Sequence, residues 1–234
     1  MVSKLLFLIG GSDGGILDLV ADEFVPAAGG RDCAIALLLM GGEGWEGHVP
    51  EYVEPWTRRG ATRHDIIVPG DDGDLDLAAA SARLREATGI FIGGGHTPTY
   101  YRLYATEPIR SVIRERYEQG VPVAGLSAGA LLAPEMCVMD PEEIGGTSPR
   151  IEPGLGLVDD LIVDVHFTER ERLPRLLEAM ARTRTTLGLG IDGSACAVLV
   201  NGRSKRVLGG PVSQVTMTDF ETRSYRIIEC DRGK

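Results

Sequence analysis

The stretch PVAGLSAGALLA, residues 122–133, predicts the fold more clearly than any other part of this chain. An apolar run precedes Ser127, and an apolar run compatible with a helix follows it. Gly125 and Gly129 flank the serine, as expected where a strand turns so tightly into a helix that Cβ atoms do not fit. Such a turn places the hydroxyl at a helix N-terminus, where backbone N–H groups stabilise developing negative charge. Ser127 is therefore a candidate nucleophile, and a plain connecting turn is the alternative.

Short apolar runs alternate with helical patterns on the N-terminal side of this turn. Strands are expected at 5–9, 34–40, 65–68, 89–92 and 122–124, and helices at 16–28, 48–59, 75–87, 99–105 and 109–119. These strands are apolar on both faces, which is typical of a parallel sheet covered by helices. Further strands are expected at 161–164, 195–200, 203–208, 215–218 and 225–228, with Asn201-Gly202 as a hairpin turn. The pattern predicts one α/β domain over residues 1–234, a three-layer α/β/α sandwich with a mostly parallel central sheet and C-terminal antiparallel strands.

Local signals predict where two of the helices begin. Asp74 is a candidate N-cap for the helix at 75–87. Thr168 and Glu171 fit a capping box, whereas Pro174 favours a helix that starts near Leu173 with the proline in its first turn.

Composition narrows the partners that this chain can have. The net charge is −10 and no basic stripe is evident, so no nucleic-acid partner is expected. No apolar stretch approaches the ~20 residues of a membrane span, so no membrane partner is expected either. The four cysteines are far apart and show no metal-like spacing, which favours reduced cysteines in a cytoplasmic protein and no metal site.

Two histidines have the position that a base for Ser127 requires. His96 and His166 both follow apolar runs, and functional groups gather at the carboxyl ends of parallel strands. His166 has the better context, because a strongly charged loop follows it directly. Arg170 and Arg172 on this loop, and Arg175 on the helix that follows it, are candidates for binding a substrate carboxylate, with solvated surface arginines as the alternative.

The sequence resembles the cyanophycinase and peptidase E family of serine peptidases, over about residues 5 to 210. Gly-Leu-Ser-Ala-Gly-Ala at 125–130 is similar to the family's nucleophile motif. Three further blocks agree in order: Gly-Gly-Gly-His at 93–96, Asp-Val-His-Phe at 164–167 and Gly-Ile-Asp-Gly at 190–193. The resemblance implies a class I glutamine amidotransferase-like fold and hydrolysis of small acidic substrates, either Asp-X dipeptides or β-linked aspartyl–arginine units. It implies no cofactor, and since some members dimerise, a homodimer is one option.

The resemblance also implies roles for individual residues. Ser127 is expected to be the nucleophile and His166 its base, with a third, acidic member about 13 to 18 residues after the serine. Glu142 is the choice in that window, with Asp140 and Glu143 as alternatives.

Glycine-rich loops and neighbouring polar residues complete the expected site. Backbone N–H groups of Ala128 and of Gly94 or Gly95 are expected to form the oxyanion hole. The loop at 10–15 is expected to line the same cleft, with a plain turn as the alternative. His96 and Asp164 are expected to contact the substrate. Asp164 would hold a substrate amine, and a hydrogen bond to the loop is the alternative.

Three pocket positions depart from the family pattern. Val165 replaces a glutamine, Gly95-His96 replaces an Asp-Gln pair, and Gly193 replaces a glutamate. These departures leave a second interpretation open, a non-catalytic or repurposed small-molecule-binding relative. An α/β-hydrolase esterase is disfavoured because 68 residues follow His166, and a glutaminase because serine replaces cysteine.

Overall fold

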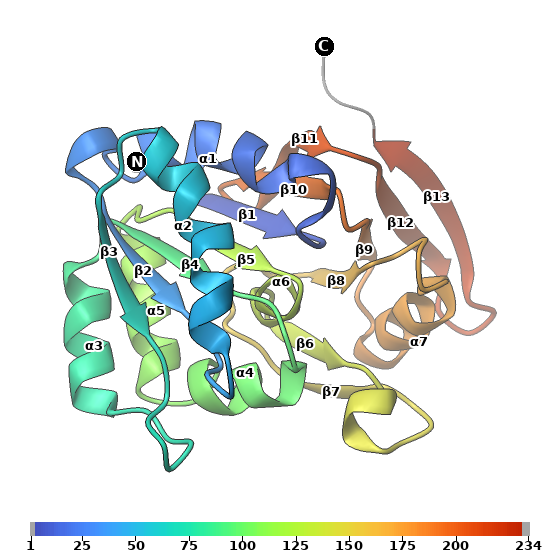
Figure 1. Ribbon diagram of the computed structural model, residues 1–234. Helices are drawn as coiled ribbons and strands as arrows, with labels where there is room; N and C mark the ends of the chain where they lie inside the picture. The colour runs from blue at the N-terminus through green and yellow to red at the C-terminus, as the bar shows by residue number, and fades with distance from the viewer. Residues whose placement is uncertain (1–2, 231–234) are drawn as a thin grey trace.

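A seven-stranded sheet forms the centre of the computed structural model, which describes residues 3–230 (Figure 1). Its strand order is β11-β10-β1-β5-β4-β2-β3. The last five strands in this order, β1, β5, β4, β2 and β3, run parallel to one another. At the other edge β10 and β11 are antiparallel. The strands are β1 (Leu5–Ile9), β2 (Ala34–Leu38), β3 (Arg63–Ile67), β4 (Gly89–Ile92), β5 (Val123–Leu126), β10 (Ala195–Val200) and β11 (Arg203–Gly209). The predicted mostly parallel central sheet is confirmed.

Helices cover both faces of this sheet, so the predicted three layers are confirmed (Figure 1). Alternate side chains of β1 face opposite ways: Phe7 packs with Phe24, and Leu8 belongs to the core that contains Tyr104. One face carries α1 (Ile16–Ala27) and α2 (Val49–Arg58). The other carries α3 (Leu77–Glu86), α4 (Thr97–Tyr104), α5 (Ile109–Glu118) and α6 (Ala128–Leu132).

A second sheet, with the order β13-β12-β9-β8, carries the strand expected at 161–164. Its strands are β8 (Leu161–Val165), β9 (Leu187–Ile191), β12 (Val212–Asp219) and β13 (Ser224–Cys230), and α7 (Leu173–Thr183) packs on it. A hairpin of β6 (Met136–Met139) and β7 (Arg150–Pro153) follows α6. One core cluster contains side chains from both larger sheets, Leu8 and Val163 among them.

Two predicted helix caps need correction, and one predicted helix start is confirmed. Asp76, not Asp74, caps α3, because its carboxylate accepts a hydrogen bond from the Ala79 amide. The capping box of Thr168 and Glu171 does not form, since α7 begins at Leu173 as the proline signal predicts. In the described part of the chain, no helix has the length and apolarity that crossing a membrane requires.

Candidate active site

Ser127 occupies the elbow, which is the sharp turn between β5 and α6. Its φ of 48° lies in a region that few non-glycine residues adopt. A Cβ on Gly125 would lie 2.4 Å from the Gly129 carbonyl oxygen, and a Cβ on Gly129 would lie 2.4 Å from that of Ile92. Both glycines are therefore sterically required, as the sequence predicts.

His166 approaches Ser127 from the second sheet. It follows β8 directly and also has a positive φ, 49°. Its Nε2 lies 3.2 Å from Ser127 Oγ, within hydrogen-bond distance, and this contact joins the two residues expected to be nucleophile and base. Because both members have strained backbones, two loops fix the geometry of the pair.

The surroundings of His166 favour its neutral form. Burial lowers the pKa of the imidazole below its ordinary value, and the charge of Arg170 adds to this effect. Glu169 and Asp13 oppose it by raising the pKa, and Arg172 lowers it further. The neutral imidazole is the form that can accept the proton of Ser127.

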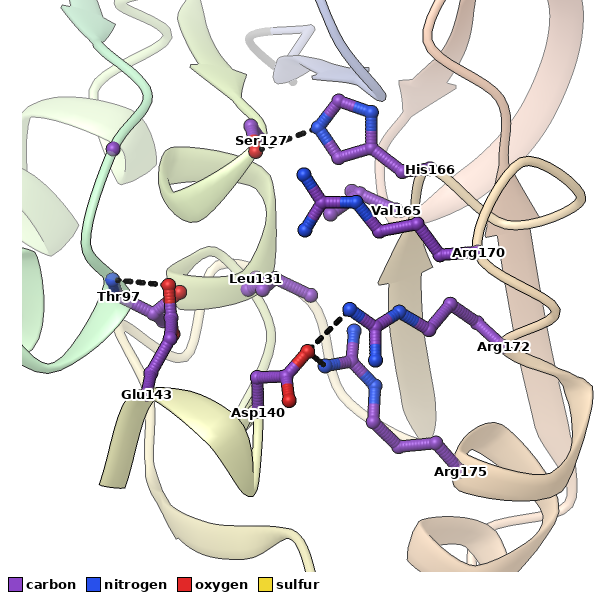
Figure 2. A pocket seen from close by; sticks show the side chains of 11 residues that line it. Thr97, Ser127, Leu131, Asp140, Glu143, Val165, His166, Arg170, Arg172 and Arg175 are labelled. Carbon is purple, nitrogen blue, oxygen red and sulfur yellow. Dashed lines mark hydrogen bonds and ion pairs between the residues drawn. The ribbon is translucent and has the colours of Figure 1, made fainter. Parts of the chain in front are cut away.

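A cavity of about 340 Å³ opens beside the pair (Figure 2). Six further predicted residues line it: Gly95, Asp140, Glu143, Arg170, Arg172 and Arg175. Thr97 and Leu131 also line the cavity, although no sequence motif marks them, and Val165 lies in the wall. The residues expected to form the site therefore gather mostly in one place.

Two of the three arginines are held by aspartates. Arg175 Nε donates to Asp164 Oδ2 at 2.8 Å, and its Nη1 donates to Asp140 Oδ2 at 2.9 Å. Arg172 also pairs with Asp140. Asp164 has no exposed surface, so it cannot hold a substrate amine as expected. Asp164 and Arg175 instead tie β8 to α7 and to the residue after β6.

Arg170 differs from the other two arginines. No described residue forms an ion pair with it, and its guanidinium points toward Ser127 (Figure 2). Arg170 is therefore the cation that a substrate carboxylate can reach beside the nucleophile.

Two of the three acids at 140–143 have partners other than His166. Asp140 binds the two arginines, and Glu143 Oε1 accepts from the Thr97 amide at 3.3 Å. Glu142 is exposed at the start of the short helix η4 (Glu142–Ile144). Asp140 and Glu143 lie across the cavity from the imidazole (Figure 2). This geometry gives no support to an acid from this turn as the partner of His166.

The Gly93-Gly94-Gly95 loop lies against the elbow. A Cβ on Gly94 would lie 3.3 Å from Ser127 Cβ. No described residue accepts a hydrogen bond from the Ala128 or Gly95 amide.

His96 is not among the residues that line the cavity. Its Nδ1 lies 2.9 Å from Thr99 Oγ1, and its Nε2 lies 3.2 Å from the Glu143 carbonyl oxygen. The side chain holds the acidic turn against α4 instead of facing the nucleophile.

Comparisons with known proteins agree with this geometry. The model of Peptidase family S51 matches residues 74–208. A cyanophycinase from Synechococcus elongatus is 29% identical over an alignment 235 residues long, and the alignment covers 96% of this chain and 72% of that protein. A peptidase E from Shewanella amazonensis is 31% identical over 148 residues, which cover 59% of this chain and 60% of that protein. The crystal structure of a peptidase from an acI-B1 Actinobacterium has a similar fold, with a TM-score of 0.66, 18% identity and coverage of 92% of this chain and 95% of that chain.

Proposed function

This chain belongs to peptidase family S51, and we propose that it hydrolyses small acidic peptides that carry an aspartyl or β-aspartyl residue at the scissile bond. The observation that carries the proposal is the contact between Ser127 Oγ and His166 Nε2, at a cavity into which Arg170 points. The contact supports acyl transfer through a serine nucleophile, and Arg170 supports an acidic substrate.

Ser127 and His166 carry the proposed reaction. Ser127 Oγ attacks the scissile carbonyl while His166 Nε2 takes the hydroxyl proton. The amide of Ala128, with that of Gly94 or Gly95, stabilises the oxyanion. His166 then gives the proton to the leaving amine, and an acyl-enzyme ester remains. Water attacks this ester by the same route, which releases the acid and restores Ser127.

The acidic preference in this proposal is local. The protein has a net charge of −10, so its overall field does not attract anions. Arg170 would instead bind the substrate carboxylate through paired N–H donors inside the cavity. The apolar side chains of Val165 and Leu131, which also line the cavity, would pack against the substrate backbone.

A panel of dipeptides tests the proposal. We expect the protein to hydrolyse Asp-X and β-aspartyl peptides and to leave the matched Asn-X peptides almost untouched. Ser127→Ala should abolish the hydrolysis while its circular dichroism spectrum stays unchanged. Hydrolysis by this variant would rule out the mechanism. A wild-type protein that binds the peptides without cleaving them would favour the binding relative, which the apolar wall at Val165 also suits.

We also propose a cytoplasmic location. Cys33, Cys137, Cys196 and Cys230 are all free in the described structure, which fits a reducing compartment. Fractionation of the cells that make this protein would test the location.

A further inference from the structure

One ring nitrogen of His166 has no partner among the described residues. Nε2 faces Ser127, and no described side chain or backbone group forms a hydrogen bond with Nδ1. In Figure 2 the imidazole lies across the cavity from Asp140 and Glu143. A serine–histidine pair gains from an acid near this nitrogen, because the acid fixes the tautomer and stabilises the imidazolium that forms.

The edge of the imidazole lies against Gly11, which in turn lies against Gly193. A Cβ on Gly11 would lie 2.9 Å from His166 Cε1 and 2.9 Å from the Gly193 Cα. The ring therefore meets the N-terminal glycine loop at the point where that loop touches Gly193.

Two carboxylates meet at Gly193. A Cβ on this residue would lie 2.5 Å from Asp13 Oδ2 and 3.3 Å from Glu169 Oε1. Glu169 Oε1 accepts a hydrogen bond from the Gly193 amide at 2.7 Å, and the Asp13 amide donates to the Gly193 carbonyl at 3.2 Å. The carboxylates thus occupy the space that any side chain at position 193 would fill, which explains the glycine there.

These two acids are the anions whose charge acts on His166. Both raise the pKa of the imidazole, against burial and against the charges of Arg170 and Arg172. Asp192, the next acid along the chain, is engaged elsewhere, because its carboxylate accepts from the Thr168 amide and hydroxyl at 2.8 and 2.7 Å.

We propose that Glu169 and Asp13 are the acidic positioning residues of His166, in place of the acids at 140–143. Glu169 has the larger role, since the Gly193 amide holds its carboxylate in place. When the proton of Ser127 moves to Nε2, the two carboxylates stabilise the positive charge of the imidazolium. This inference rests on the proposed function, because it assigns the acid of the same reaction.

The test measures the pKa of His166 directly, by NMR titration of the imidazole signals. His166→Asn identifies the signal by its loss. Glu169→Gln with Asp13→Asn should lower the pKa by about 0.5 to 1 unit, because both negative charges are lost. The same double variant should lower kcat about tenfold or more and change KM little.

The matched control is Asp159→Asn with Glu86→Gln, which makes the same change in net charge at exposed positions outside the site. It should leave the His166 pKa and kcat unchanged. Each single variant should show part of the effect, with Glu169→Gln the larger. Asp13→Asn alone keeps the Gly193 contact of Glu169 and serves if the double variant does not fold.

Two results would overturn the inference. One is a His166 pKa in the double variant equal to that of the control. The other is a fall in the His166 pKa that is larger in Glu142→Gln than in the double variant. The NMR titration does not require turnover. A wild-type protein that hydrolyses none of the peptides would contradict the proposed function, and the His166 pKa values of the variants could still be compared.

Discussion

Arg170 is the residue on which the charge preference of the cavity depends. Arg172 and Arg175 are neutralised by aspartates, while no described residue pairs with Arg170. We expect Arg170→Ala to lower kcat/KM for acidic peptides about tenfold or more, because leaving the substrate carboxylate unpaired costs about 2–5 kcal/mol. Neutral peptides should be affected far less, and Arg170→Lys should restore only part of the loss because lysine lacks the planar fork.

The control for this prediction is Arg85→Ala, at an exposed position on α3 that has no ion pair in the described structure. It should leave kcat/KM unchanged for both acidic and neutral peptides. Equal losses on acidic and neutral peptides in Arg170→Ala would show that the arginine is structural and would remove the support for an acidic substrate.

The elbow is the element whose sequence requirement is strictest. A Cβ at Gly129 would lie 2.4 Å from the Ile92 carbonyl oxygen, and backbone atoms there cannot move aside cheaply. Gly129→Ala should lower the free energy of unfolding by about 1–3 kcal/mol, as other overpacked cores do, and should lower kcat/KM as well. Urea denaturation measures the first effect.

Gly47→Ala is the matched control, because nothing lies within 4 Å of a Cβ there and the residue has no positive φ. This change should be neutral or stabilise by about 0.4–1 kcal/mol, since alanine restricts the unfolded chain. If both alanines had the same effect on unfolding, steric crowding would not be the reason for the glycine in the elbow.

Most strands with continuous apolar runs could be predicted, although β6 was missed. β1, β4 and β5 were expected within a residue or two, because their strands are buried on both faces. β9, with the sequence LGLGI, was missed. Its Gly190 is needed for packing, since a Cβ there would lie 2.3 Å from the Phe167 ring, and this contact is not visible in the local pattern.

The residues of the candidate site that belong to a local sequence motif could be predicted. Ser127 and His166 each follow a buried strand, and the structure brings their side chains into contact. The pairing of Asp164 with Arg175 was not predicted, because it joins a strand to a helix that local spacing does not place. The carboxylate of Asp13 lies far along the chain from His166, so only the packing of the glycine loop on Gly193 reveals it.

At the scale of the whole molecule, the site lies where two sheets meet. The central sheet supplies Ser127 after β5, and the second sheet supplies His166 after β8. The reactive pair therefore depends on the packing of the two sheets, which share one hydrophobic core.

The net charge of −10 predicts how kcat/KM depends on ionic strength. Raising the ionic strength from about 0.01 to 0.15 M shortens the Debye length from about 30 to 8 Å, which screens the overall field more than contacts inside the cavity. We expect kcat/KM for a net-negative peptide to stay level or rise. A steep fall that a neutral peptide does not share would show long-range attraction and contradict the local role of Arg170.

The most direct test of the whole account is labelling by a fluorophosphonate, followed by mass spectrometry of the site. We expect one equivalent per chain on Ser127 and none in Ser127→Ala. The rate should fall in acid with a midpoint below about 6.5, because burial lowers the pKa of His166 and only the neutral base is active. No labelling of the native protein, or labelling of Ser127 at full rate in His166→Ala, would contradict the assignment of Ser127 and His166 as nucleophile and base.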